Sequence, residues 1–243
     1  MSVILLDDKE VRSYTSLGTM DILENAELAR SFCEIINNRG LYDHSLDTAR
    51  YAVQIGLVFD KTMDLIELAK AGLLHDIGKL DIPVEILNKP GKLNDYEFSI
   101  MQTHPRKGFD RLCQLGVEEQ VQDAALRHHE KLSGMGYPDG ITEISLMTQI
   151  ITVSDIFSAL TELRSYKKPI SSSKAFKIMR EEMSGLNSEF IDILESRVID
   201  ESEDFRARQI AAYIRGTSWA RSVNLVHMLG DEILCKVVRN YEG

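Results

Sequence analysis

Cysteine is scarce in this sequence: three residues among 243, none close enough to another to form a CxxC pair. Cys33, Cys113 and Cys235 therefore predict neither a disulfide framework nor a thiolate metal site. A reduced, cytoplasmic compartment is the simplest interpretation. The first residues lack the basic start and long apolar stretch of a signal peptide. No stretch approaches the roughly 18 consecutive apolar residues of a membrane-spanning helix, so we expect no membrane insertion.

Basic residues are outnumbered by acidic ones. The chain has 28 lysines and arginines against 38 aspartates and glutamates, which gives a formal net charge of −10. A surface that coats a nucleic-acid polymer needs many basic contacts with phosphate, so that class of partner is disfavoured. A small anionic ligand is compatible with this charge only where a local basic patch or bound metal cations attract it.

Proline is rare too, with five residues in the chain, and no alternating pattern typical of β-strands reaches a useful length. Apolar residues instead recur with the period of a helix. The sequence therefore predicts an all-α protein. The expected helices cover residues 20–37, 45–57, 62–75, 94–104, 118–129, 145–163, 173–183 and 188–198, with two more over 205–241.

A few residues bear on where these helices begin and end. Thr19 is the expected N-cap of the first, and Pro105 is expected to interrupt or kink the helix that Asn94 begins. Residues 76–93 and 133–140 are rich in glycine and proline and predict loops, the first with one short helical turn. We expect an N-terminal helical segment over 1–40, a main domain over 41–200 and a C-terminal helical extension over 201–243.

Five of the six histidines lie between residues 44 and 129, at the ends of successive predicted segments. A single histidine is more often a packed or surface residue than a metal ligand. A helical bundle, however, builds a metal site by aiming several such side chains at one internal point. Imidazole and carboxylate are the ligands that suit Mn, Fe, Co, Ni and Zn. The clustered residues are His44, His75, His104, His128 and His129.

Two adjacent pairs, His75–Asp76 and His128–His129, indicate more than one metal. Neighbouring residues on a helix diverge by roughly 100°, because a turn takes about 3.6 residues. Such pairs suit a site with two metals better than a site with one, and the two oxygens of Asp76 make it the natural bridging ligand. The alternative is that His75–Asp76 is a surface dipeptide, which conflicts with the alanine- and leucine-rich run before it.

Several segments carry a family resemblance. LLHDIGKLDIP, residues 73–83, resembles the signature of HD-domain phosphohydrolases, and HHEKLSGMGYPDG, residues 128–140, is similar to the second signature of their HD-GYP subgroup. Residues 43–56, 88–112 and 148–169 also resemble that subgroup, in its order along the chain. An HD or GYP motif alone is weak, but together the segments are specific and cover roughly residues 41–195. The resemblance implies an HD-domain helical bundle with short flanking helices.

The resemblance also implies roles for individual residues. Lys79 matches the lysine beside the scissile phosphate, and Arg164 and Lys167 match basic positions that hold substrate phosphates. Tyr137 is the tyrosine of the GYP triplet. Asp76 and Lys79 are the expected catalytic residues. The implied metal ligands are His44, His75, Asp76, His104, His128, His129 and Asp155.

The implied activity is metal-dependent hydrolysis of cyclic di-GMP to linear pGpG, with GMP as an alternative end point. Two divalent transition-metal ions would hold and activate a water between them. Iron or manganese is the expected metal, with zinc, nickel or cobalt as alternatives. Lys79 would bind a phosphate oxygen or protonate the leaving group. Taken alone, a lysine is more often a solvated surface charge.

The substrate contacts leave alternatives open. Tyr137 suits stacking on a guanine, but packing of its own loop is an equal alternative. Arg164 and Lys167 are expected near the end of the helix that bears Asp155. There they would contact phosphate, or complement the helix dipole, or do both.

Three departures from the subgroup's pattern matter. Gly40 stands where members with three metals have a glutamate, so we expect two metals. Ser133 and Ser158 stand where aspartate is usual; the first bears on the order of the GYP loop, and the second is expected to affect helix packing. These changes keep two alternatives open. One is a catalytically weak nucleotide or metal sensor, and the other is a phosphohydrolase for another cyclic dinucleotide or nucleotide. The terminal helices could also serve a homodimer or a signalling partner, with core packing as the alternative.

Overall fold

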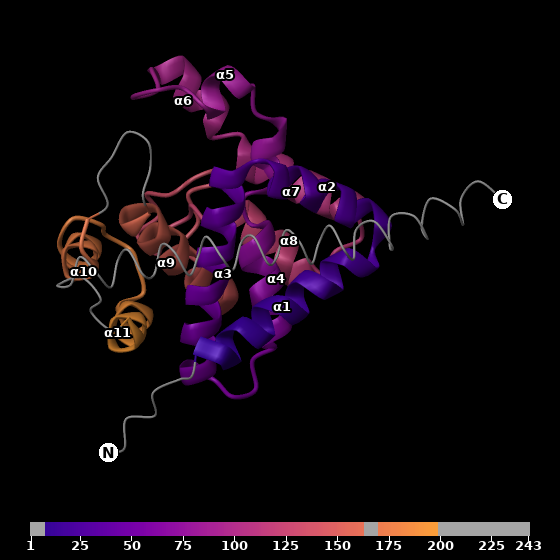
Figure 1. Ribbon diagram of the computed structural model, residues 1–243. Coiled ribbons are helices and arrows are strands. Elements are labelled where there is room, and N and C mark those ends of the chain that lie inside the picture. The colour runs from indigo at the N-terminus through magenta and orange to yellow at the C-terminus, as the bar shows by residue number, and fades with distance from the viewer. Residues whose placement is uncertain (1–7, 163–169, 199–243) are drawn as a thin grey trace. The chain divides into compact units, whose positions relative to one another are not determined.

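The computed structural model describes residues 8–162 and 170–198, which belong to the first of two units into which the chain divides after Val198 (Figure 1). These ranges contain helices and no strand, which confirms the predicted all-α class. The boundary predicted at residue 40 stays a prediction. The predicted extension over 201–243, with its two helices, lies outside the described residues.

The helices follow one another with short connections. In chain order they are α1 (Asp8–Glu24), α2 (Ala26–Asn37), α3 (Arg39–Phe59), α4 (Leu65–Leu74), the 3-10 helix η1 (Ile77–Asp81), α5 (Val84–Leu87), α6 (Asp95–Met101), α7 (His104–Gln114), α8 (Glu119–Arg127), α9 (Leu146–Thr161), α10 (Ser172–Glu181) and α11 (Ser188–Arg197).

Helix α3 is the element around which the site is built, because it packs against both α4 and α9. Its inner residues Ala49, Ala52 and Val53 are completely buried. On α4, Gly72 allows the closest approach: a Cβ there would lie 2.5 Å from the Cα of Ala49. Burial of each larger apolar side chain in such a core contributes about 1.5–3 kcal/mol. The result is a tightly packed pair of helices, and His75 and Asp76 follow directly after the second of them.

The first predicted helix is in fact two. Asn25 accepts hydrogen bonds from the amides of Glu27 and Leu28, both at 3.1 Å, and so begins α2 in the middle of the predicted range. The predicted cap, Thr19, lies inside α1, where its hydroxyl donates to the carbonyl of Thr15 at 3.0 Å. The prediction failed because the apolar period continues across both helices, while the asparagine side chain ends one and caps the next.

Pro105 starts a helix and does not kink one. Helix α6 ends at Met101, and Pro105 occupies the first turn of α7, where a helix needs no amide from proline. The predicted start at Asn94 is confirmed by a capping box, in which the side chains of Asn94 and Glu97 each accept from the other's amide at 2.8 Å. Helix α7 therefore begins at His104, which places that imidazole at a junction of two helices.

The connection between η1 and α7 stands apart from the core. None of residues 83–103 is buried, and Figure 1 shows α5 and α6 together, away from the other labelled helices. This arm leads from the segment of Lys79 directly to His104. No helix within the described ranges is both long and apolar enough to cross a membrane.

Helix α9 is shorter than predicted. Ser145 caps it through the amide of Thr148, and it ends at Thr161, after which Glu162 takes an extended conformation with ψ 142°. We expected Arg164 and Lys167 near the end of this helix. Both residues are outside the described part of the chain.

Candidate metal centre

Three of the predicted ligand histidines sit where a helix ends. Nδ1 of His75 lies 2.8 Å from the carbonyl of Gly72, Nδ1 of His104 lies 2.8 Å from the carbonyl of Met101, and Nδ1 of His128 lies 3.0 Å from the carbonyl of Ala125. The last carbonyls of a helix have no amide partner within it, so they accept the imidazole N–H. A carbonyl only accepts, which places the proton on Nδ1 and leaves a lone pair on Nε2.

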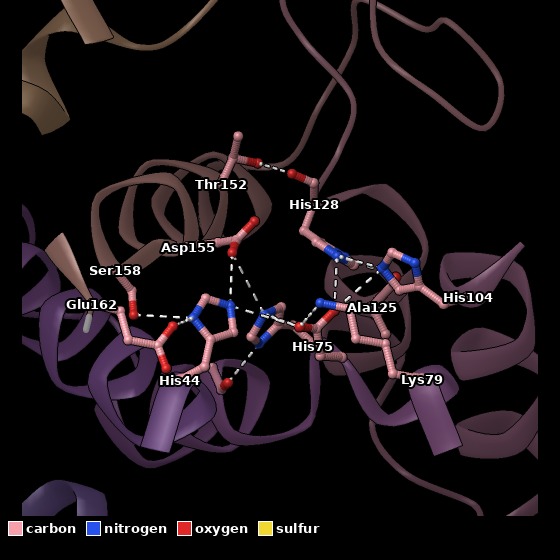
Figure 2. Close-up of polar contacts among 12 residues, drawn as sticks. His44, His75, Lys79, His104, Ala125, His128, Thr152, Asp155, Ser158 and Glu162 are labelled. Carbon is pink, nitrogen blue, oxygen red and sulfur yellow. Dashed lines mark hydrogen bonds and ion pairs between the residues drawn. The ribbon is translucent and has the colours of Figure 1, made fainter. Parts of the chain in front are cut away.

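His44 is held differently, because it lies inside α3. Its Nδ1 is 3.1 Å from the hydroxyl oxygen of Ser158 on α9. Its Nε2 is 2.9 Å from Asp155 Oδ1, also on α9. Figure 2 shows His44 pointing with His75, His104 and His128 toward one centre. Ser158, which we expected to affect helix packing, also touches a candidate ligand through its hydroxyl.

Asp76 divides its two oxygens between two groups of histidines. Oδ1 lies 3.2 Å from His104 Nε2 and 3.6 Å from His128 Nε2. Oδ2 lies 3.3 Å from His75 Nε2 and 3.6 Å from His44 Nε2. This is the arrangement expected of a carboxylate that bridges two metals. This geometry supports the two-metal hypothesis more directly than the adjacent residue pairs in the sequence do.

All seven predicted ligands come together. Their donor atoms form three groups within 4.8 Å, and all seven residues are buried except His129, which is half-buried. The groups are Asp76 with His104, His128 and His129; His44 with His75 and Asp76; and His75 with His128 and Asp155.

The charges of the site suit metal ligation. Burial alone would raise the pKa of the Asp76 carboxyl, but the adjacent Lys79 ammonium holds it well below its usual range. Burial would likewise raise the pKa of Asp155, but the contact with His44 holds it low. Burial lowers the pKa of His104 and of His129. At neutral pH the carboxylates are therefore ionised and these imidazoles neutral, which are the forms that bind metals.

The cluster also contains buried polar atoms that lack a hydrogen-bond partner, as a metal site would. His75 Nε2 and Asp76 Oδ1 are buried without a hydrogen-bond partner among the described residues. The bare Nε2 atoms of His104 and His128 lie 3.2 Å apart, lone pair toward lone pair. Buried acceptors that face one another are costly unless a cation lies among them. The described cluster therefore fits a divalent metal.

Lys79 reaches the site from η1. Its ammonium donates to Asp76 Oδ2, and the side chain is 21% exposed. Helix α4 ends at Leu74, and the 3-10 helix η1 then brings Lys79 beside Asp76. The lysine therefore lies between the buried carboxylate and the surface, where a bound phosphate could reach it.

Tyr137 packs on a predicted ligand. Its ring stacks on His129 with centroids 4.6 Å apart and an interplanar angle of 24°. Burial, followed by the charges of Asp76 and Asp155, raises the pKa of its phenol. The geometry favours the packing alternative for this residue. A substrate contact through the exposed part of the ring stays a prediction.

Sequence reasoning missed Glu130. This buried carboxylate follows the double histidine, and its Oε1 accepts from the amides of Asp139 at 2.6 Å and Gly140 at 3.0 Å. The loop folds tightly around it: a Cβ on Gly136 would lie 2.4 Å from the Cα of Glu130. Glu130 thus ties the GYP loop to the end of α8. An acidic residue directly after two ligands was the available signal.

The remaining departures sit at the edge of the site. Gly40 is exposed in the first turn of α3, one turn before His44, and offers no side chain. Ser133 is exposed in the GYP loop and packs beside Gly185, where a Cβ would lie 2.6 Å from its hydroxyl oxygen. Neither residue adds a ligand to the cluster.

Comparison with known families matches residues 60–186 to the HD domain. That range is more than half of the chain, and the chain belongs to the HD-domain family. Within that family, its relatives place it in the HD-GYP subgroup.

Two curated relatives illustrate the similarity. A cyclic di-GMP phosphodiesterase of Pseudomonas aeruginosa is 39% identical over 144 residues, which cover 58% of this chain and 35% of that protein. A 3'3'-cGAMP-specific phosphodiesterase of Vibrio cholerae is 38% identical over 213 residues, which cover 84% of this chain and 47% of that protein. The chain therefore spans less than half the length of either relative.

Two solved structures share the fold. An HDGYP protein from Bdellovibrio bacteriovorus aligns with a TM-score of 0.56 at 14% identity, over 77% of this chain and 63% of that one. The HD domain of an L. monocytogenes phosphodiesterase, in complex with cyclic di-AMP, aligns with a TM-score of 0.53 at 18% identity, over 69% and 92%. At these identities the likeness establishes the HD-domain architecture.

Proposed function

We propose that this chain is a metal-dependent phosphodiesterase that hydrolyses cyclic di-GMP to linear pGpG. The observation that carries the proposal is the division of Asp76 between two groups of histidines, with Oδ1 toward His104 and His128 and Oδ2 toward His44 and His75. Pairs of metal ions about 3.5–4 Å apart are a recurring solution for cleaving phosphodiesters. The names of the relatives support a cyclic dinucleotide as the substrate class.

The chain's own residues divide into two sets for the two ions. Asp76, His104, His128 and His129 would hold one, and His44, His75 and Asp76 the other. We add Asp155 to the second set, because its Oδ1 lies 2.9 Å from His44 Nε2. We propose iron or manganese, in keeping with the nitrogen and oxygen donors. Two bound divalent ions would supply a polarised phosphoryl group and a water nucleophile at neutral pH.

Lys79 supplies the proton-handling group. Its ammonium is held at Asp76 Oδ2 and is partly exposed, so it can turn toward a substrate that enters from the surface. There it would donate a hydrogen bond to a non-bridging phosphate oxygen, or a proton to the leaving ribose oxygen. Such a positioned acid contributes roughly 10²–10⁴-fold to a rate.

The second phosphate of the substrate needs cations of its own. Arg164 and Lys167 are our proposal for this role, although both lie outside the described residues. Replacing both with alanine should raise KM strongly and leave the metal content unchanged, because neither is in the proposed ligand set. Each lost charge-assisted hydrogen bond should weaken binding by about 1.5–3 kcal/mol.

A metal and substrate assay tests the proposal. Elemental analysis of the purified chain should give about two transition-metal ions, as the two-metal argument requires, and the loaded protein should convert cyclic di-GMP to pGpG. A well-occupied third site would contradict the role of Gly40. A protein that holds two ions and cleaves no cyclic dinucleotide would be the sensor that the sequence left as an alternative.

A second substrate is favoured by one comparison. The relative that covers 84% of this chain is named as specific for 3'3'-cGAMP, a cyclic dinucleotide with the same two phosphates and one different base. Parallel assays with cyclic di-GMP, 3'3'-cGAMP and cyclic di-AMP, compared by kcat/KM, separate these substrates.

A further inference from the structure

The four anchored histidines of the centre differ in what holds their Nδ1 atoms. His75, His104 and His128 are held by backbone carbonyls, which can only accept a hydrogen bond. His44 is held by the hydroxyl of Ser158, which can accept or donate. The carbonyls therefore fix the tautomer that leaves Nε2 bare for a metal, whereas the hydroxyl does not.

The reason lies in the place of His44 in its helix. It is the sixth residue of α3, where the carbonyls one turn earlier are engaged by the helix's own amides. The metal-binding tautomer of His44 therefore needs an acceptor from outside α3, and the Ser158 hydroxyl on α9 can serve as one. Asp155 and Ser158 are three residues apart on α9, so they share a face and touch opposite nitrogens of the ring at 2.9 and 3.1 Å.

Ser158 is not behaving as an ordinary helical serine. Hydroxyls inside helices commonly donate to a carbonyl one turn earlier. A neighbour on α9 does so: Thr161 donates to the carbonyl of Phe157 at 2.8 Å. The hydroxyl of Thr152 lies 2.9 Å from the carbonyls of both Thr148 and His128. Ser158 is 1% exposed and contacts His44. Ser154, one turn earlier and equally buried, has no hydrogen-bond partner in the described structure.

The contacts of His44 also accommodate the other tautomer. With the proton on Nε2, His44 donates to Asp155 Oδ1 at 2.9 Å, and the Ser158 hydroxyl donates to Nδ1. For His44 Nε2 to serve as a metal ligand, this hydrogen bond would be lost, the proton would lie on Nδ1, and the Ser158 hydroxyl would accept it. The three carbonyl-held histidines need no such change.

We propose that Ser158 is a positioning residue that does not fix His44 in its metal-binding tautomer, so that the ion held by His44, His75, Asp76 and Asp155 is the weaker-bound of the two. An acceptor-only side chain at position 158 would fix the metal-binding tautomer and strengthen that ion alone. The proposal rests on the two-metal part of the proposed function and not on the identity of the substrate.

One nearby charge favours the metal-binding tautomer, but only weakly. The Glu162 Oε2 atom lies 3.9 Å from Nδ1 of His44, one turn beyond Ser158, with its side chain 15% exposed. A carboxylate at that distance favours an Nδ1 that carries a proton. It is too far for a hydrogen bond, so it biases the tautomer and does not fix it.

The test is a binding titration of Mn²⁺ into the metal-free 243-residue chain and three variants. The wild type should bind two ions with unequal affinities. Ser158→Asp should tighten the weaker ion about 10- to 100-fold, and Ser158→Ala should weaken it by a similar factor, the range seen for outer partners of metal ligands. The tighter ion should be unaffected in both. Ser154→Ala is the matched control and should bind as the wild type does.

A second measurement covers a variant that fails to fold. Nitrogen NMR of the wild-type histidines should show the proton of His44 on Nε2 without metal and on Nδ1 with a diamagnetic divalent ion such as Zn²⁺. A proton on Nδ1 in both states would overturn the proposal. So would equal affinities in the wild type, an unchanged weaker ion in Ser158→Asp, or the same loss in Ser154→Ala as in Ser158→Ala.

These outcomes are separate from those of the proposed function. A wild type that shows the predicted affinities and the tautomer change but hydrolyses no cyclic dinucleotide refutes the enzyme and retains the role of Ser158. An active phosphodiesterase whose metal affinities do not respond to position 158 refutes the role of Ser158 alone.

Discussion

The centre has two halves whose histidines are oriented in different ways. The helix-end half contains His104, His128 and His129, and the mid-helix half contains His44, His75 and Asp155. In the helix-end half, His104 and His128 take their orientation from carbonyls of the helices that they follow. In the mid-helix half, His44 depends on Ser158, a side chain 114 positions away in the sequence. The first half needs its own helices to form. The second also needs α3 and α9 to pack in register, so the two halves should respond differently to substitution.

The largest expected effect is the loss of metal from both halves together. Asp76→Ala removes the carboxylate that both halves share, so metal content should fall from two ions to nearly none. Hydrolysis should fall by more than the roughly 100-fold typical of losing an outer partner. Elemental analysis and circular dichroism check this together, since the helices should survive. Asp81→Ala, which removes an exposed aspartate paired with Arg111, is the control and should keep both ions.

Full turnover by Asp76→Ala would refute the assignment of the whole site. Loss of a single ion would instead show that Asp76 belongs to one half and does not bridge.

The next prediction separates the halves. His104→Ala should remove the ion of the helix-end half, and His44→Ala the ion of the mid-helix half, leaving about one ion in each variant under the two-metal argument. Manganese titration of the two proteins should give one remaining site in each, of different affinity. Identical residual affinities would show that the halves are equivalent.

A third prediction concerns the loop that covers the helix-end half. Glu130→Ala removes the acceptor of two loop amides, at 2.6 and 3.0 Å. Each lost charge-assisted hydrogen bond should lower the free energy of unfolding by about 1.5–3 kcal/mol, and kcat should fall more than metal content. Glu130→Gln keeps an acceptor oxygen and should lose less. Urea unfolding measures both, with exposed Glu143→Ala as control; equal stability of all three would contradict the tie.

The smallest effect on the centre should come from Lys70, which lies in neither half. Burial alone would lower its pKa, but hydrogen bonds to Asp21 and Glu118 outweigh it and raise the pKa. The stabilisation is therefore complete at neutral pH and is lost as pH rises through the folded-state pKa, above the ordinary 10.5. Lys70→Met should flatten this alkaline loss of stability in pH-dependent melts while binding metal as the wild type does. Altered metal affinities would show that α4 transmits strain to the centre.

Much of the site could be predicted because its motifs are local. His75 with Asp76, and His128 with His129, are adjacent in the sequence, and their helical segments were predicted from apolar periodicity alone. The structure brings all seven predicted ligands together, while their role as ligands stays a prediction until metal is measured. The fold class followed in the same way, from the helical period and the lack of an alternating one.

What escaped prediction depends on choices that one sequence leaves equal. Thr19 and Asn25 are both capable caps, and only packing selects the second. Pro105 suits a kink and a first helical turn alike. Ser154 and Ser158 have the same side chain on the same helix, yet Ser158 contacts His44 on another helix and Ser154 has no polar partner in the described structure. The role of Glu130 was missed because its partners are backbone amides, which no sequence pattern distinguishes.

The carbonyl anchors have a consequence for how this centre can change over generations. No point mutation deletes a backbone carbonyl, so the orientations of His75, His104 and His128 are inherited for as long as their helices form. The anchor of His44 is encoded by a single codon, that of Ser158. Heritable variation in histidine orientation should therefore concentrate at this position, where one nucleotide change can alter the mid-helix half while the helix-end half stays fixed.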